Sequence, residues 1–244
     1  MEKRKSYIAP ELKNSYLSPQ YDLLGGNAGH PSHAVVFVDA NNWYHNVKKF
    51  IDPSEVDILK VAKFLCEVKK YNLVGVRWYA STPSIADGER MYYKHMAFLQ
   101  HLEKKGIKVI TRKLQRISNK EIQKKRRDTI DNLDLCDHCR PLVESVFLDL
   151  ADLKKKEKGI DVWVAIDMIK ESVIDKNCDV CILISGDADF TPALSLIKSH
   201  GKEVLTAMVP VGYSSELIRE FPFCILRKET LMKCLRGYRE KPPS

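Results

Sequence analysis

Two aspartates that directly follow an apolar segment are the residues of this sequence best placed to do chemistry. Asp187 and Asp189 come just after residues 180–184, an unbroken apolar run with β-branched side chains. Such a run is typical of a strand buried on both faces of a parallel sheet. In open α/β sheets, ligands bind at the carboxyl ends of the strands. Two carboxylates so close repel each other unless a cation lies between them, which favours a divalent metal ion. Thr191 is the predicted N-cap of the helix that follows, and Pro192 its first helical residue. The alternative for the two acids is a helix cap plus a solvated aspartate.

A second apolar run also ends in an acid. Residues 34–38 are followed by Asp39, and Asn42 comes three positions later. The arrangement repeats that of the first pair, a predicted strand with a carboxylate at its carboxyl end. The Asn42 amide could hydrogen-bond a carboxylate, a metal-bound water or a phosphate. A simple turn residue remains the alternative for Asp39.

A third acid precedes an apolar helix. Asp161 stands at the amino end of a helix predicted from residue 162, where it could cap the helix or point to the same edge of the sheet. Residues 162–169 are apolar nearly all round, which predicts heavy packing against the sheet. Asp167 lies on another side of this helix and is expected to support the site or the structure. Lys158, just before the helix, could reach a phosphate.

Apolar strands and amphipathic helices alternate along the chain, with no hairpin signal between them. This alternation predicts βαβ units and a parallel sheet. The predicted strands are residues 34–38, 73–79, 107–110, 180–184, 203–208 and, at an edge, 223–226. The predicted helices are residues 56–68, 89–105, 162–169, 193–200 and 216–220.

Residues 112–157 interrupt this alternation and form a predicted basic insertion. Its cations could contact nucleic-acid phosphates independently of sequence, or they could form a solvated helix face. Residues 143–153 fit either a short helix or a hairpin. The candidate RNA-binding residues are Arg112, Lys113, Arg116, Lys124, Lys125, Arg126, Arg127 and, beyond the insertion, Lys158.

The insertion also contains a Cys-x2-Cys pair. Cys136 and Cys139, with His138 between them, make half of a zinc site. A complete structural zinc site would need His138, another histidine or the same pair from a second chain. The sequence thus leaves structural zinc and a homodimer open.

Composition indicates a globular protein with polyanionic partners. The chain has 244 residues, 44% of them hydrophobic, and a net charge of +8. No apolar run is long enough to cross a membrane, and no apolar segment follows the basic N-terminus. Seven cysteines, an odd number, favour reduced thiols and a cytoplasmic location. We expect a polar arm over residues 1–32, one domain over residues 33–228 and a basic tail over residues 229–244.

Three motifs resemble those of the NYN domains, the LabA-like branch of the PIN-like nuclease superfamily. They are Phe37-Val-Asp-Ala-Asn-Asn42, Lys158-Gly-Ile-Asp-Val162 with Asp167, and Ser185-Gly-Asp-Ala-Asp-Phe190. The resemblance spans about residues 33–228, in the family's order. It implies a three-layer α/β/α sandwich with a mainly parallel sheet. It also implies a Mg²⁺ or Mn²⁺ site on Asp39, Asp161, Asp187 and Asp189, and action on RNA. The basic insertion and the N-terminal arm depart from the family pattern.

The chemistry implied is metal-assisted hydrolysis of phosphodiester bonds by an endoribonuclease. Carboxylates are hard oxygen ligands that suit Mg²⁺ or Mn²⁺, which would activate a water and stabilise the leaving oxygen. Asp39 and Asp187 are the expected direct ligands. Asp161 and Asp189 would act through water, and Asn42 and Ser185 would orient these ligands.

Two other functions fit the same residues. The first is a non-catalytic RNA-binding or adaptor protein that keeps the acids. The second is a phosphatase acting on a small phosphate ester, although no phosphate-binding G-x-x-x-x-G-K-[ST] loop occurs. The sequence does not indicate the RNA target, endonucleolytic or exonucleolytic attack, cleavage of DNA, or the pathway.

Overall fold

A six-stranded sheet forms the centre of the molecule. The structure is a computed structural model that describes residues 32–85, 88–113, 115–116, 124, 127–149, 155–156 and 159–238. The strand order is β3-β2-β1-β6-β7-β8, and every neighbouring pair is parallel. The strands are β1 (His33–Asp39), β2 (Asn72–Thr82), β3 (Lys108–Lys113), β6 (Val180–Ile184), β7 (Glu203–Met208) and β8 (Phe223–Ile225).

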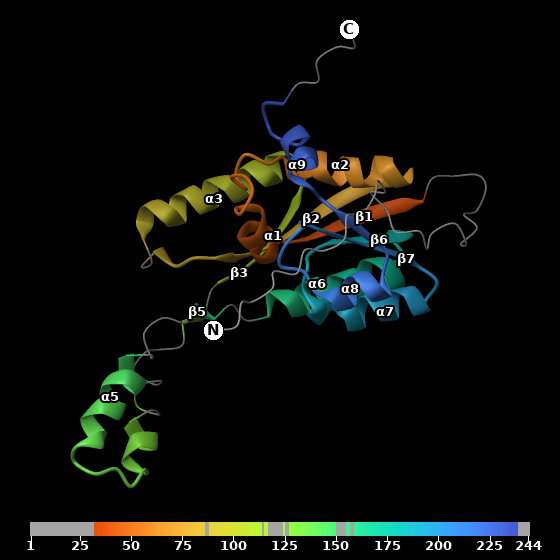
Figure 1. Cartoon of the computed structure of the whole chain (residues 1–244). Coiled ribbons are helices and arrows are strands. Elements are labelled where there is room, and N and C mark those ends of the chain that lie inside the picture. Colours follow the sequence, from red (N-terminus) through yellow and green to blue (C-terminus); the bar gives the residue numbers. More distant parts are fainter. Residues whose placement is uncertain are drawn as a thin grey trace, which may run out of the picture.

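Helices cover both faces of this sheet, so the domain has three layers (Figure 1). One face carries α1 (Ala40–Val47), α2 (Ile58–Lys69), α3 (Glu89–Lys104) and α9 (Lys228–Lys233). The other face carries α6 (Ile160–Ile169), α7 (Thr191–Ser199) and α8 (Ser215–Glu220). Successive β1 side chains enter opposite cores, because Val36 packs under the first layer and Val35 and Phe37 pack under the second.

The two central strands end together. β1 lies between β2 and β6, and Val38 pairs with Ile184 while Asp39 pairs with Tyr79. All residues of β6 are buried, as expected for a strand covered on both faces. The carboxyl ends of β1 and β6 therefore meet at one edge, and residues that follow either strand are neighbours there.

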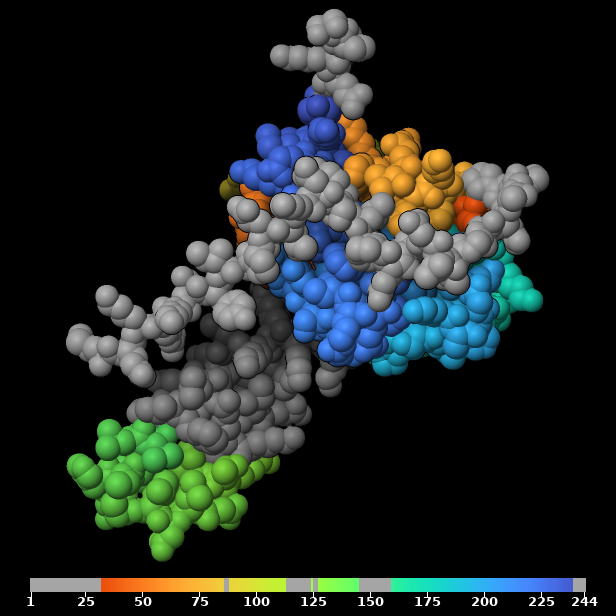
Figure 2. All heavy atoms as spheres, turned by 45° about the vertical axis from the view of Figure 1, so that its right-hand side comes forward, coloured from red at the N-terminus to blue at the C-terminus, as the bar shows by residue number. Residues whose placement is uncertain are grey.

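The insertion leaves and rejoins the domain at this same edge. It begins after β3 and ends before α6, and a two-stranded antiparallel ribbon of β4 (Gln115–Arg116) and β5 (Lys155–Lys156) joins its ends. It also contains α5 (Cys139–Asp149). Figure 1 shows α5 well away from the sheet, and in Figure 2 the green residues of this segment form a lobe separate from the main body.

A buried ion pair fixes α6 and the π-helical turn that continues it, η3 (Lys170–Ile174), on the sheet. Arg77 of β2 donates two hydrogen bonds to the Glu171 carboxylate, at 2.7 and 2.8 Å. These hydrogen bonds raise the pKa of Arg77. Asp167 lies in α6, one helical turn before Glu171. Its carboxylate accepts a hydrogen bond of 2.9 Å from the Tyr79 hydroxyl. Burial and this hydrogen bond raise the pKa of Tyr79, so it remains a donor.

The structure confirms the predicted fold class and corrects several local features. The sequence did not decide between a helix and a hairpin for residues 143–153. In the structure, residues 143–149 belong to the helix α5. The β4–β5 ribbon was not predicted. The predicted tail begins too early, because Leu231 and Cys234 are buried in the core. None of the helices in the described ranges is long and apolar enough to cross a membrane. The predicted N-terminal arm, residues 1–32, lies outside the described residues except for residue 32.

The predicted helix starts are wrong at two positions. Phe190, not Thr191, is the N-cap of α7, and Pro192 lies in its first turn. Gly159 is the N-cap of α6, with a φ of 79°, and Asp161 lies inside the first turn. The residue that takes the capping position lies one position earlier in α7 and two positions earlier in α6.

Glu171→Gln is expected to lower the free energy of unfolding by about 1.5–3 kcal/mol, because the partly buried Arg77 would lose its charged hydrogen-bond acceptor. Chemical denaturation measures this change. Lys108, also near Glu171 but 61% exposed, provides the control. Lys108→Ala should change stability by less than about 0.5 kcal/mol. Equal effects of the two substitutions would contradict a stabilising role for the Arg77–Glu171 pair.

Candidate active site

Asp39 connects the ends of the two central strands. Its side chain is 3% exposed, and its Oδ1 accepts hydrogen bonds from the backbone N–H groups of Asn41 and Asn42, both at 3.1 Å. Asp39 is therefore the N-cap of α1. Its Oδ2 accepts a hydrogen bond from the Ser185 hydroxyl at 3.0 Å. The carboxylate thus joins β1, α1 and the turn after β6.

Ser185 also connects Asp39 to Asp187. The Asp187 N–H donates to Ser185 Oγ at 3.2 Å, and Asp187 Oδ1 accepts from the Asp189 N–H at 3.0 Å. Asp187 is the N-cap of the short 3₁₀ helix η4 (Ala188–Phe190), and its side chain is half-buried. Asp189 is exposed. Ser185 thus bridges Asp39 and Asp187, and its role in orienting metal ligands stays a prediction.

Asn42 contacts the same turn from α1. Its Oδ1 accepts from the Gly186 N–H at 3.0 Å and from Asn46 Nδ2 at 3.2 Å. Asn46, which the sequence analysis missed, also donates to the Gly212 carbonyl at 3.4 Å. The i, i+4 spacing of the two asparagines on α1 was the available signal.

The loop after β7 closes one side of the site. The Ser214 N–H donates to the Gly186 carbonyl at 2.8 Å. A Cβ at Gly186 would lie 2.8 Å from the Gly212 carbonyl oxygen and from Tyr213 Cα. Gly212 itself has a φ of 70°. Glycine at position 186 thus permits a close backbone approach, which the sequence analysis did not anticipate.

Asp161 reaches this edge by topology. α6 starts at the carboxyl edge of the sheet, and it contacts η4, which contains Asp189. The Asp161 side chain is exposed. Asp167 faces the buried Tyr79 and a polar cavity of about 140 Å³ that Arg77 and Glu171 also line. These contacts favour the structural role for Asp167.

The donor set suits a hard cation but does not form a complete site. Within the described residues, no group of three or more His, Cys, Asp and Glu side chains lies close enough together to hold a metal ion. Asp39 and Asp187 are nevertheless linked through one hydroxyl and offer oxygen ligands only. Mg²⁺ commonly binds through one or two carboxylates and completes its shell with water and substrate phosphates. The chemistry of these residues thus fits Mg²⁺ or Mn²⁺.

The predicted RNA-binding residues are only partly described. Arg112, at the end of β3, lies beside the first turn of α6. Lys124 and Arg127 are exposed in the insertion. For Lys113 and Arg116 the structure describes the backbone alone. Lys125, Arg126 and Lys158 lie outside the described residues.

The Cys-x2-Cys pair is exposed at the start of α5. Cys136 and Cys139 are free thiols, and the Cys139 N–H donates to the Cys136 carbonyl at 3.0 Å. Hydrogen bonds from Cys139 lower the pKa of the Cys136 thiol. His138 does not complete a metal-binding group with them in the described residues. Zinc binding within one chain thus gains no support.

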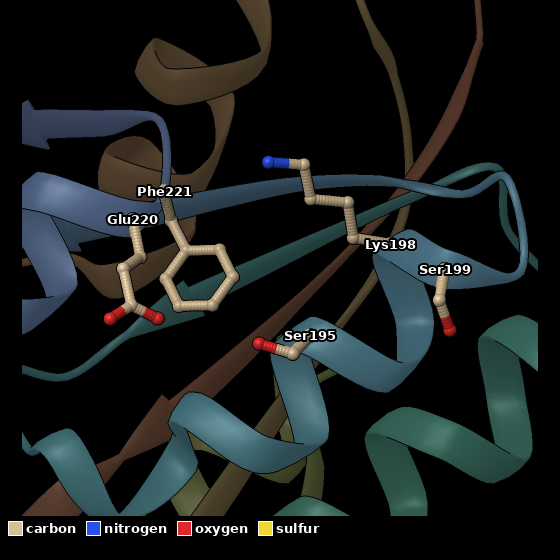
Figure 3. A pocket seen from close by; sticks show the side chains of 5 residues that line it. All are labelled: Ser195, Lys198, Ser199, Glu220 and Phe221. Carbon is tan, nitrogen blue, oxygen red and sulfur yellow. The ribbon is translucent and has the colours of Figure 1, made fainter.

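One hollow in the described surface lies away from the aspartates. It has a volume of about 400 Å³ and is formed by α7 and the end of α8. In Figure 3, Lys198 extends over this hollow from α7, opposite Glu220 and Phe221. Its lining residues are Ser195, Lys198, Ser199, Glu220 and Phe221, and none of the candidate acids is among them.

A doubly wound parallel sheet with carboxylates at its carboxyl edge defines an α/β protein of PIN-like architecture. The family model for the NYN domain matches residues 33–225, so the chain belongs to the NYN domain family, within the PIN-like nuclease superfamily. No curated protein matches the chain. Among solved structures, a protein of unknown function from Vibrio parahaemolyticus RIMD 2210633 is similar, with 18% identity and a TM-score of 0.49. The alignment covers 82% of this chain and 95% of that chain.

Gly186→Ala is expected to destabilise the protein and to disturb the candidate site, because the new Cβ would collide with the backbone of the 212–213 loop. Overpacking of this kind costs about 1–3 kcal/mol. Thermal unfolding measures the loss. Gly237→Ala, where a Cβ meets no atom within 4 Å, is the control. A Gly186→Ala protein as stable as this control would show that the loop moves away freely.

Alkylation of the native protein at neutral pH is expected to modify Cys136 first, because a lowered pKa increases its thiolate fraction. Peptide mass spectrometry identifies the modified sites. Burial raises the pKa of four other thiols to about 11, which should protect Cys66, Cys178, Cys224 and Cys234. Complete modification in denaturant is the control. Early modification of these four thiols in the native protein would refute this order.

Proposed function

We propose that the protein is a metal-dependent endoribonuclease that hydrolyses RNA phosphodiester bonds at the edge formed by β1 and β6. The observation that carries the proposal is the hydrogen-bonded chain from Asp39 through Ser185 to Asp187. This chain links oxygen donors from two adjacent strand ends. Membership of the NYN domain family supports it, because the superfamily comprises nucleases.

In the proposed mechanism, Asp39 and Asp187 would hold Mg²⁺ or Mn²⁺, and Asp161 and Asp189 would contribute through water. When bound, such an ion supplies an activated water and stabilises negative charge on the phosphate and the leaving oxygen. Ser185 holds the Asp39 carboxylate in one orientation by donating to its Oδ2. Asn42 supports the turn that carries Asp187 by accepting from the Gly186 N–H.

The substrate phosphates would be bound by cations near this edge. Both ends of the basic insertion lie at the carboxyl edge of the sheet, since β3 ends there and α6 begins there. Arg112 is in position beside α6, and Lys124 and Arg127 are exposed farther along the insertion. Phosphate contacts of this kind give affinity that is independent of sequence and weakens with salt.

A non-catalytic RNA-binding protein is the second candidate. It is favoured by one observation, that the described acids do not form a group of three close enough to hold a metal ion. In this case the Asp39–Ser185 hydrogen bond would mainly stabilise the carboxyl ends of β1 and β6. The basic side chains near them would bind the RNA. RNA affinity would then be indifferent to metal.

Asp187→Asn is expected to slow the cleavage of labelled single-stranded RNA by about 100-fold or more, because several kcal/mol of charge stabilisation would be lost. RNA binding should stay the same or become tighter, since one negative charge is removed. Cleavage in Mn²⁺, Mg²⁺ and EDTA measures the effect, and EDTA should abolish cleavage by the wild type.

Asp175→Asn is the matched control. Asp175 is an exposed aspartate that follows η3 at the opposite edge of the sheet, so its substitution should leave the cleavage rate unchanged. Equal loss of binding and cleavage in Asp187→Asn would refute the metal-site assignment. Salt-sensitive binding without cleavage in any metal would support the binding protein instead.

A further inference from the structure

The first turns of α6 expose a large apolar surface. Val162 is 58% exposed, Trp163 43% and Ile166 56%, although the apolar composition of this helix predicts heavy packing against the sheet. The buried side of α6 is formed by Ile160, Val164 and Met168. Single exposed apolar residues are common, whereas a contiguous group on one helix indicates an interaction surface.

An arginine from another part of the chain stacks on this surface. The Arg112 guanidinium lies 5.3 Å from the centre of the Trp163 ring, which is cation–π geometry. The guanidinium also lies close to Gly159, where a Cβ would require the end of the Arg112 side chain to shift. The end of β3 and the start of α6 thus cooperate to hold one aromatic ring beside one fixed positive charge.

Trp163 is also distinguished by its position. The other tryptophans, Trp43 and Trp78, are 5% and 4% exposed and belong to the core. Trp163 comes two residues after Asp161, at the edge where the candidate acids lie. An exposed tryptophan is costly to leave in water, and at this place it can contact whatever approaches the acids.

We propose that Trp163, with Arg112 stacked on it, is a platform that binds an unpaired nucleobase of a single-stranded RNA substrate. The inference rests on the proposed function and adds a preference to it, for unpaired over paired RNA. The indole provides a π-face, and Arg112 provides charge for the phosphate of the same or the next nucleotide. Stacking on aromatic side chains is tolerant of base identity, because every base has a π-face.

The charge of Arg112 beside the ring favours an unpaired nucleotide over an apolar protein partner. A cation stacked on the exposed ring of an apolar surface suits an anionic nucleotide better than an aliphatic side chain. The same combination occurs on α1, which begins directly after Asp39, where Lys48 lies 5.6 Å from the ring of Tyr44, itself 53% exposed. Bases inside a duplex are already stacked on each other, so they offer no free face to either ring.

Tryptophan fluorescence tests this proposal directly, because Trp163 is the exposed member of the three. A short oligouridylate in EDTA, added to the full-length Asp187→Asn protein, is expected to quench the emission saturably. A duplex of the same length should quench it much less. Trp163→Phe, made in the same background, should remove the quenching but keep affinity within about threefold, since phenylalanine also stacks. Trp163→Ala should weaken binding by about 5- to 150-fold, which corresponds to about 1–3 kcal/mol for one stacked base.

Tyr93→Ala is the control for loss of an exposed aromatic ring. Tyr93 is 57% exposed on α3, and its substitution should leave affinity unchanged. Equal quenching by duplex and single strand, or unchanged affinity in Trp163→Ala, would overturn the proposal. Self-association that Trp163→Ala abolishes, measured by sedimentation, would overturn it in favour of an interface between two copies.

The outcome is separable from that of the proposed nuclease activity. Saturable quenching by single strands, without cleavage by the wild type in any metal, would support the platform and refute the nuclease. Metal-dependent cleavage without quenching would refute the platform alone. Absence of both binding and cleavage would refute both.

Discussion

A single buried carboxylate organises the edge of the sheet on which every functional inference depends. Asp39 is almost fully buried and would be costly to keep charged without strong hydrogen bonds. It receives them from the first turn of α1 and from Ser185. Because Ser185 lies 146 residues from Asp39 in sequence, satisfying this one charge fixes the end of β1 relative to the end of β6. The position of Asp187 follows from that constraint, since its N–H donates to the same hydroxyl.

The layers of the fold were predictable because the central strands β1 and β6 are buried on both faces. Such strands appear in the sequence as short continuous apolar runs, and residues 34–38 and 180–184 correspond closely to β1 and β6. Helix starts were less predictable, because neighbouring residues compete for one capping position. Thr191 has a suitable side chain, yet the 3₁₀ turn capped by Asp187 shifts the start of α7 by one residue. Local preference alone does not decide between such neighbours.

For the candidate site, the sequence predicted the four acids together with Ser185 and Asn42, but not the long-range contacts around them. The order of strands and helices places Asp39, Asp161, Asp187 and Asp189 at one edge, and that order can be derived from apolar patterning. The supporting contacts are long-range. Arg77 pairs with Glu171, which is 94 positions away, and Gly186 depends on how closely the 212–213 loop approaches. The exposed side of α6 was also missed, because composition does not show which face of an apolar helix the sheet covers.

The β4–β5 ribbon has a consequence for how this protein can vary. The ribbon pairs residues 115–116 with residues 155–156, so the two ends of the insertion are held side by side. A change in the length or sequence of the segment between β4 and β5 then alters the loop-closure entropy only slightly. It leaves the register of the central strands intact. The part of the insertion beyond the ribbon can therefore vary in length and sequence while the carboxyl ends of the central strands, with the candidate acids, keep their structure.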